Sequence, residues 1–251
     1  MVLIEAPKSN RLLVALADTD PECWERSVER VELSLGQMLT EPGRPPRHAY
    51  FPGDAIVSLF SLVSEGESAE FAVVGNEGLV GTSLYLGGVF ATSHSSVLIA
   101  GQGFRVGAQV LTEAFERSDA ARLLLLRYAQ ALATQIGQTA VCNRLHTIEQ
   151  QLCNWLLHVL DRQGHGEVVI TQGLIAGALG VRRESVTEAA GRLQAAGIIR
   201  CARGRISVLD RVRLERRCCE CHAVLKKEYD RLLPPASAIR PAAWRAWPLA
   251  A

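Results

Sequence analysis

The sequence lacks a long apolar run, because no stretch approaches the ~18 consecutive apolar residues of a membrane span. The apolar run nearest the N-terminus, Leu12 to Ala17, is shorter than the hydrophobic region of a secretory signal. We therefore expect a cytoplasmic protein without membrane contact. The seven cysteines are an odd number, which predicts reduced thiols rather than a disulfide framework.

Motifs typical of enzymes are also missing. The sequence shows no glycine-rich phosphate loop, no Ser/His/Asp set and no paired metal ligands with usable spacing. We therefore expect neither catalysis nor a bound cofactor. With 48% hydrophobic and 21% charged residues, the composition is that of a globular protein, and 251 residues suffice for two domains.

Lysine is absent from residues 171–217, which carry 10 arginines against 4 acidic residues. The charge of the whole chain is +1, but the sequence up to His146 holds 11 basic and 16 acidic residues, and the remainder holds 16 and 10. This asymmetry indicates an acidic module joined to a basic one. Nucleic acid is the commonest partner of a basic module, and the forked donors of arginine suit phosphate and guanine.

Residues 44–105 predict short strands separated by turns. Pairs such as Pro45-Pro46 and Gly87-Gly88 and the turn Gly75-Asn76-Glu77-Gly78 alternate with apolar pieces such as Ala55 to Phe60. Regular short strands with glycine turns favour an antiparallel sandwich or barrel.

The pattern changes from about Leu111 to His146, where the only helix breaker is Gly137. This stretch predicts one long helix. Residues on it are spaced alternately by four and three, as in a coiled-coil seam, which favours a dimer over an ordinary core helix with a wide apolar face. The predicted seam is Leu125, Ala129, Leu132, Ile136, Thr139 and Asn143.

Residues 172–189 follow the helix-turn-helix pattern. Two helices that cross steeply need a small residue where their backbones approach, which Ala176 supplies, and a residue that tolerates positive φ, which Gly180 supplies. The second, DNA-reading helix is predicted from about Arg182 to Ala196. After it, residues 198–200 and 205–209 alternate like two strands around the turn at 202–204, which predicts a β-wing. A solvated basic surface without a nucleic-acid partner is the alternative.

In this order of elements, and most clearly over Thr171 to Leu209, the chain resembles the Crp/Fnr superfamily of bacterial regulators. The resemblance implies an α+β fold with an N-terminal cyclic-nucleotide-binding-type β-roll, a long dimerisation helix and a C-terminal winged helix-turn-helix. The expected parts are a sensor domain at 1–110, the dimerisation helix at 111–146, the DNA-binding domain at 147–217, and a C-terminal helix with a Pro/Ala-rich tail at 218–251.

The first turns of a recognition helix point into the major groove. Helix geometry then presents Arg183, Glu184, Thr187 and Glu188 to the bases. By resemblance, Arg183 and Glu184 match a pair that contacts guanine and cytosine in relatives, whereas Glu188 stands where relatives have an arginine. The residues expected to contact phosphate are Arg182, Arg192, Arg203 and Arg205. The expected partners are double-stranded DNA, a second copy of the chain as a homodimer, and RNA polymerase.

The expected effector pocket departs from that of relatives that bind cyclic AMP. Those relatives use a Gly-Glu and an Arg-Ser pair, where this chain has Gly81-Thr82 and Thr92-Ser93. A buried cyclic phosphate needs a cation, so cyclic AMP is not the expected effector. An N-terminal iron–sulfur cluster is disfavoured because only Cys23 lies there. The signal is expected to be another small molecule or a redox change.

Cys218, Cys219, Cys221 and His222 lie close together near the end of the basic half. An apolar stripe through Leu214 and Leu225 favours buried cysteines in a helix core, and a second Cys-x-x-Cys is missing, so we expect no metal there. Metal binding and redox sensing remain the alternatives. His94 and His48 are the candidate haem ligands, but a lone histidine beside strands is more often structural.

A second class of function is a ligand- or redox-sensing module that acts through protein contacts and has lost DNA binding. Such a loss would leave neutral or acidic residues where Arg182 and Arg183 stand. Because both arginines are present, the DNA-binding regulator is favoured.

Overall fold

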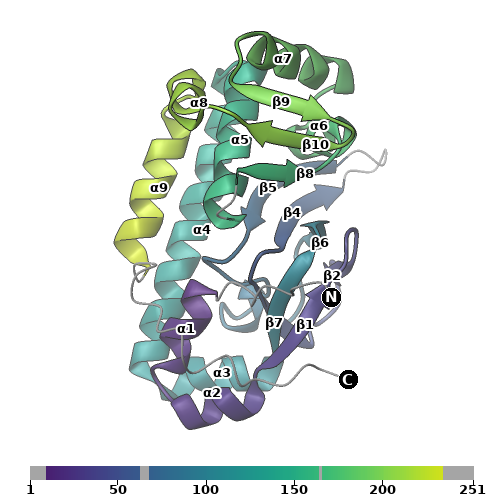
Figure 1. Ribbon diagram of the computed structural model, residues 1–251. Coiled ribbons are helices and arrows are strands. Elements are labelled where there is room, and N and C mark those ends of the chain that lie inside the picture. The colour runs from purple at the N-terminus through teal and green to yellow at the C-terminus, as the bar shows by residue number, and fades with distance from the viewer. Residues whose placement is uncertain (1–9, 63–67, 164–165, 234–251) are drawn as a thin grey trace, which may run out of the picture.

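The computed structural model describes residues 10–62, 68–163 and 166–233. Figure 1 shows an elongated molecule in which strands and short helices occupy one end, a small helical module with three strands occupies the other, and a long helix runs between them. None of the helices described is both long and apolar enough to cross a membrane.

The N-terminal part is built from two antiparallel sheets that face each other, as the sequence predicts. One has the order β1-β7-β3 and the other β2-β6-β4-β5. Alternate residues such as Ala49 and Phe51 point into the shared core. The strands are β1 (Glu29–Leu33), β2 (Met38–Thr40), β3 (His48–Pro52), β4 (Ile56–Leu62), β5 (Ser68–Val74), β6 (His94–Ile99) and β7 (Gly101–Gly107), and the 3-10 helix η1 (Thr82–Leu84) follows β5.

Three short helices close the lower end of this part in Figure 1. They are α1 (Arg11–Ala17), α2 (Pro21–Ser27) and α3 (Ala108–Arg117). The apolar run at residues 12–17 forms α1, and its leucines are buried in the core of the sheets. Buried Asn10 caps α1 by accepting from Leu13 N at 2.9 Å, and its amide nitrogen donates to Pro52 O at 2.9 Å and Gly78 O at 2.7 Å. One side chain therefore fixes α1 to two loops of the sheets.

The helix expected from about Leu111 to His146 is two helices, which corrects the sequence prediction. Helix α3 ends at Arg117, and α4 (Asp119–Leu145) begins after Ser118. Ser118 has extended backbone angles, and its hydroxyl accepts from Ala121 N at 3.2 Å, so it caps α4 and separates the two helices.

One face of α4 packs on the sheets. Leu125 is fully buried and Leu132 is 7% exposed, and both belong to the chain's own core. Their place in the expected dimer seam is therefore corrected. Ile136 of the same predicted seam is 38% exposed, and Leu126, which follows Leu125, is 44% exposed. Because one residue corresponds to about 100° of rotation around a helix, Leu126 lies on the outside of α4 although Leu125 lies on the inside.

The C-terminal module has a core of its own, which also receives Ile56, Val73, Leu98 and Ile99 from the sheets. Its three strands have the antiparallel order β8-β10-β9. After them the chain returns along α4 (Figure 1). The elements are α5 (Ile148–Gln163), β8 (Glu167–Val169), α6 (Gln172–Leu179), α7 (Arg183–Ala195), β9 (Ile199–Ala202), β10 (Arg205–Val208), α8 (Arg211–Arg217) and α9 (Cys221–Leu232). The tail at 234–251 lies outside the described residues.

A buried ion pair joins the module to the sheets. Arg162 near the end of α5 donates from Nε to Glu77 Oε1 at 2.8 Å, and the two side chains are 7% and 6% exposed. The guanidinium also donates to Gln135 Oε1 on α4 at 3.3 Å, and Tyr229 of α9 donates to the same oxygen at 2.7 Å. The absence of a side chain at Gly75 leaves room for Arg162, because a Cβ on residue 75 would lie 2.7 Å from the Cβ of Arg162.

This pair gives the first testable expectation. Glu77→Ala leaves the Arg162 guanidinium buried without a counter-ion, which costs roughly 3–5 kcal/mol of unfolding free energy. Urea denaturation followed by circular dichroism measures the loss. The control is Glu228→Ala, which breaks the exposed pair of Glu228 with Arg231 at 2.8 Å and should leave the midpoint unchanged. Equal midpoints for both variants would show that the buried pair does not hold the fold together.

Candidate nucleic-acid interface

The helix-turn-helix forms where the sequence predicts it. Thr171 caps α6 by accepting from Leu174 N at 3.3 Å, and Gly180 ends it in the left-handed region with φ 64°. The nitrogen of Val181 then donates to Ala176 O at 3.0 Å, so the chain turns back on the small buried residue expected at the crossing.

Helix α7 buries one face and exposes the other. Val186, Ala189 and Leu193 lie in the core of the module. The residues proposed to read bases all lie on the exposed face, and they are Arg183, Glu184, Thr187 and Glu188. Burial of the inner face thus fixes which side of the helix is available to a major groove.

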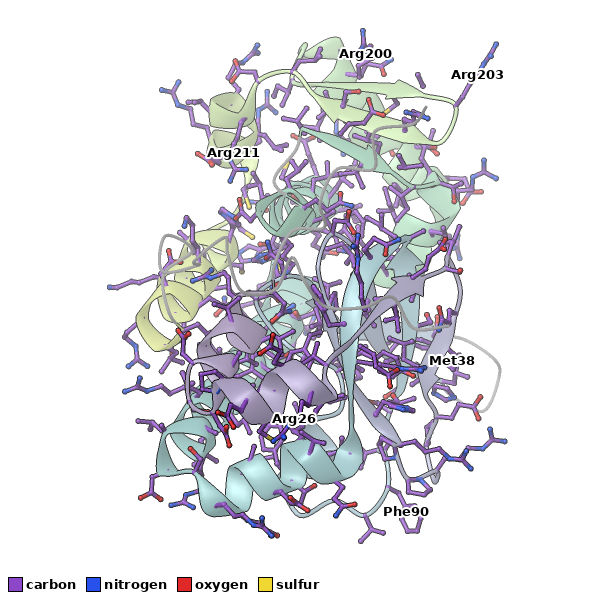
Figure 2. All side chains as sticks on the ribbon, turned by 60° about the horizontal axis from the view of Figure 1, so that its bottom comes forward. Arg26, Met38, Phe90, Arg200, Arg203 and Arg211 are labelled. Carbon is purple, nitrogen blue, oxygen red and sulfur yellow. The ribbon has the colours of Figure 1, made fainter. Side chains whose placement is uncertain are left out.

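The wing is a hairpin with a two-residue turn. Ala202 pairs with Arg205, and the turn residues Arg203 and Gly204 have φ 42° and 77°. Positive φ at both positions is the geometry of a type I′ turn, which matches the twist of the strands. Among the described residues, Arg203 is the one residue other than glycine with positive φ. Figure 2 shows its side chain at the tip of the hairpin, pointing away from the molecule, with Arg200 at the same end.

A groove of about 290 Å³ lies between the wing and the start of α7. It is lined by Arg183 from the helix and by Arg203 and Arg205 from the wing. The structure therefore places one proposed base reader and two proposed phosphate contacts on one surface. Within the described chain, Arg183 and Arg203 take part in no ion pair. Their guanidinium groups are available to an anion.

Two of the expected phosphate contacts are engaged within the chain. Arg192 donates to Glu149 Oε2 at 2.8 Å and to Glu188 Oε1 at 2.7 Å, so it links α7 to α5. Arg205 donates to Glu167 Oε1 at 2.7 Å across the wing. Hydrogen bonds from Arg192 and Arg217 hold the pKa of Glu149 below its usual range. Arg192 thus positions the recognition helix, a role that sequence spacing did not reveal.

The expected effector residues line a small cavity between the sheets and α4. Gly81, Thr82, Thr92 and Ser93 meet there, with Leu132 at the helix side. The cavity holds about 50 Å³, whereas ligand sites usually hold ~300–1,000 Å³. The described residues that line it are all uncharged.

The two candidate haem ligands lie apart from that cavity. His94 stacks on Phe60 with ring centroids 5.2 Å apart, and His48 lies against Tyr50 at 6.1 Å. Each histidine is therefore packed against an aromatic neighbour on a strand.

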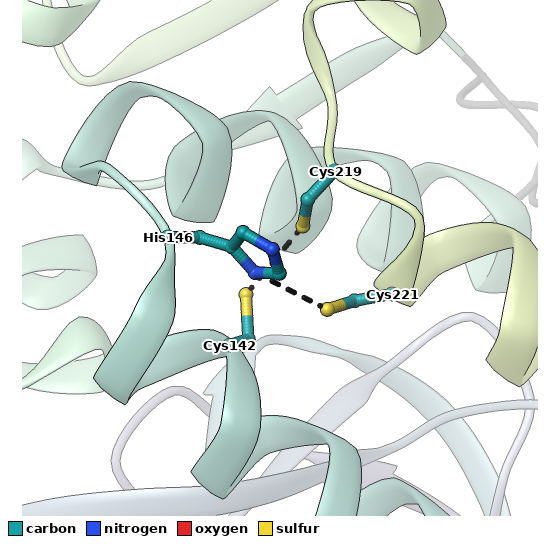
Figure 3. Close-up of side chains that lie close together, drawn as sticks. All are labelled: Cys142, His146, Cys219 and Cys221. Carbon is teal, nitrogen blue, oxygen red and sulfur yellow. Dashed lines mark hydrogen bonds between the residues drawn. The ribbon is translucent and has the colours of Figure 1, made fainter.

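The cysteine-rich segment differs from the expected single helical stripe. Helix α8 ends at Arg217 and α9 begins at Cys221, so the intervening residues form a connection rather than a helix turn. His222 turns to Asp161, with Nε2 2.7 Å from Oδ2. Cys219 and Cys221 instead meet Cys142 and His146 of the α4 end, as Figure 3 shows. Sequence reasoning missed these two partners because they lie more than 70 residues away.

Two thiols of this group lie within hydrogen-bond distance of each other. Cys142 Sγ lies 3.7 Å from Cys219 Sγ. Hydrogen bonds from Cys142 and Cys218 lower the pKa of Cys219, whereas the hydrogen bond to Cys219 and burial raise the pKa of Cys142.

Part of the chain matches a known protein family. Residues 150–217 match the family model of the Crp-like helix-turn-helix domain. No curated protein matches the chain.

Solved structures match about three quarters of the chain. FixK2 from Bradyrhizobium japonicum is 16% identical, with a TM-score of 0.66 over 76% of this chain and 98% of that one. A CRP-family transcriptional regulator from Thermus thermophilus is 18% identical, with a TM-score of 0.62 over 74% and 95%. The c-di-GMP responsive regulator CLP from Xanthomonas campestris is 16% identical, with a TM-score of 0.58 over 76% and 98%. Residues 150–217 thus form a Crp-like helix-turn-helix domain, and the fold of the chain is similar to that of these solved structures.

Proposed function

We propose that the protein is a sequence-specific transcription regulator that binds an inverted-repeat operator as a homodimer. The observation that carries the proposal is the groove lined by Arg183 of the recognition helix and by Arg203 of the wing. A helix that enters the major groove with a flanking wing on the backbone needs this arrangement. It combines base recognition with phosphate contacts on one surface.

Base recognition follows from the side chains exposed at the start of α7. Arg183 can donate two hydrogen bonds to guanine O6 and N7, and Glu184 can accept from cytosine N4. We expect a G·C pair under Arg183 in each half-site. At the adjacent base pair we expect a different preference from that of relatives, because Glu188 replaces their arginine and a carboxylate cannot donate to guanine. Arg192 donates to the Glu188 carboxylate at 2.7 Å, which restricts the rotation of that side chain.

The proposed dimer seam is the exposed stripe of α4. Its residues are spaced alternately by three and four, as in a coiled coil, and every one of them is exposed or half-buried. Three residues of the sequence-based seam remain, while Leu125, Leu132 and Thr139 are replaced by their neighbours. The revised seam is Leu126, Ala129, Ala133, Ile136, Ala140 and Asn143. Two copies joined there would present two recognition helices to successive half-sites about 34 Å apart.

The signal is proposed to act at the N-terminal sheets, and RNA polymerase is the proposed protein partner on the promoter. Support for coupling comes from the pair of Glu77 and Arg162, which connects a sheet loop to the first helix of the DNA-binding module. A ligand that moves the loop after β5 therefore acts directly on α5. The uncharged cavity at Thr92 favours an effector other than a cyclic nucleotide.

Replacement of the base reader should change specificity. Arg183→Ala should cost about 1–3 kcal/mol at the preferred site and relax the preference at one position per half-site. Binding-site selection from a random DNA pool measures both effects. The matched control is Arg203→Ala, which should weaken all sequences alike because phosphate contacts do not read bases. An unchanged preference at every position in the Arg183→Ala protein would refute the assignment.

A charge in the seam should separate the protomers. Leu126→Glu places a carboxylate against its symmetry mate, and sedimentation velocity should then show monomers. Leu35→Glu is the control, because Leu35 is a similarly exposed leucine, at 60%, on the turn after β1. If the Leu126→Glu protein sediments as a dimer like its control, the seam lies elsewhere.

Cyclic AMP should not bind. The cavity at Thr92 offers no cation to a cyclic phosphate and is much smaller than a nucleotide site. Titration calorimetry of the full chain should show no saturable heat at micromolar cyclic AMP. A saturable, micromolar-affinity signal would require a pocket with a different shape from the one described.

A further inference from the structure

Four potential metal ligands converge where α4 ends. Cys142 lies on the last turns of α4, His146 follows the helix, Cys219 lies between α8 and α9, and Cys221 begins α9. Their ligand atoms all lie within 4.8 Å of one another. Figure 3 shows the three sulfurs arranged around the imidazole ring. All three cysteines are buried, at 2%, 7% and 0% exposure.

We propose that these residues bind one zinc ion as a closed, tetrahedral Cys3His site. Zinc takes thiolate sulfur at about 2.3 Å and imidazole nitrogen at about 2.0 Å in such sites. A regular tetrahedron with these bond lengths separates two sulfurs by about 3.8 Å and a sulfur from a nitrogen by about 3.5 Å. The corresponding distances are 3.7 Å between Cys142 Sγ and Cys219 Sγ and 3.4 Å between Cys221 Sγ and His146 Nδ1.

The surroundings of the four residues also fit a metal site. His146 turns Nδ1 to the sulfurs, and its Nε2 lies 3.4 Å from the carboxylate of Glu220. Metal-binding histidines characteristically direct the second ring nitrogen to a carboxylate. Gln138 Nε2 donates to Cys221 Sγ at 3.1 Å, which stabilises negative charge on that sulfur. Simple burial of thiols requires none of these contacts.

The donor set and its size select among metals. Calcium and magnesium need oxygen ligands, which the cluster does not offer. A cluster of several iron atoms fills the space between its ligands and would hold them further apart than a single ion. Zinc binding releases the thiol protons to solvent as each sulfur becomes a thiolate ligand, and no electron is transferred.

The ion would join the two chain segments that flank the DNA-binding module. Cys142 and His146 end the proposed dimerisation helix immediately before α5, and Cys219 and Cys221 follow the last helix of the matched domain. Zinc would therefore fix both ends of the module to α4. This regulatory consequence rests on the proposed DNA-binding function, whereas zinc binding itself does not.

The test uses the full chain, produced in zinc-supplemented medium and purified under reducing conditions. Elemental analysis should find about one zinc per chain, because a closed four-ligand site retains its ion through purification. Cys219→Ser should lower the zinc content at least several-fold. The matched control is Cys218→Ser, which changes the adjacent cysteine outside the four-residue group and should retain zinc.

Cobalt provides a measurement that does not depend on variants. Titration of the metal-depleted wild-type chain with Co²⁺ should produce the visible bands of tetrahedral coordination together with thiolate-to-cobalt absorption, and zinc should abolish both. Protein without zinc and without cobalt bands would overturn the proposal. Iron in place of zinc, or a Cys142–Cys219 disulfide in the reduced preparation, would overturn it equally.

DNA affinity is measured separately on zinc-loaded and metal-depleted wild-type protein. If the ion fixes the module, depletion should weaken binding to the selected operator at least ten-fold, and added zinc should restore it. Zinc content without any DNA binding would contradict the proposed function and leave the metal site standing. DNA binding by protein that contains no zinc would contradict the metal site and leave the proposed function standing.

Discussion

The buried pair of Glu77 and Arg162 is the interaction on which the relation between the two halves depends. A charged pair removed from water stabilises a fold only when its remaining donors and acceptors are also satisfied. Here the Arg162 guanidinium reaches Gln135 on α4 and His158 O on α5, and the ring of Tyr229 lies 5.5 Å from it. One arginine thus connects the sheets, the long helix and the C-terminal helix.

Much of the fold follows from local sequence patterns. Gly180 and Ala176 mark the turn of the helix-turn-helix because the backbone there permits little else, and Arg203-Gly204 closes a hairpin between alternating strands. Local patterns could not choose between two adjacent stripes of α4, since both are apolar and both have helical spacing. Only packing against the sheets shows that Leu125 is internal and Leu126 external.

The cysteine cluster shows where sequence reasoning reaches its limit. Cys219 and Cys221 are visible as a close pair, but Cys142 and His146 belong to a different helix and carry no motif with usable spacing. A spacing of four in a predicted helix would place Cys142 and His146 on the same side, although in the structure α4 ends at Leu145 and His146 follows it with extended backbone angles. That spacing was visible in the sequence. The segment that supplies Cys219 and Cys221 could be matched to it only once the packing of α9 along α4 was known.

Helix α5 is held along its whole length, which gives the proposed signal at the sheets a physical route to the proposed DNA surface. At its start, Gln151 donates to His146 O at 2.9 Å, beside the cysteine cluster. In its middle, Trp155 donates to Glu70 of β5 at 3.1 Å, where burial raises the pKa of that carboxyl to about 7. At its end, Arg162 meets Glu77. Because Glu149 on the same helix accepts from Arg192 of α7 at 2.8 Å, α5 connects the sheets to the proposed recognition helix.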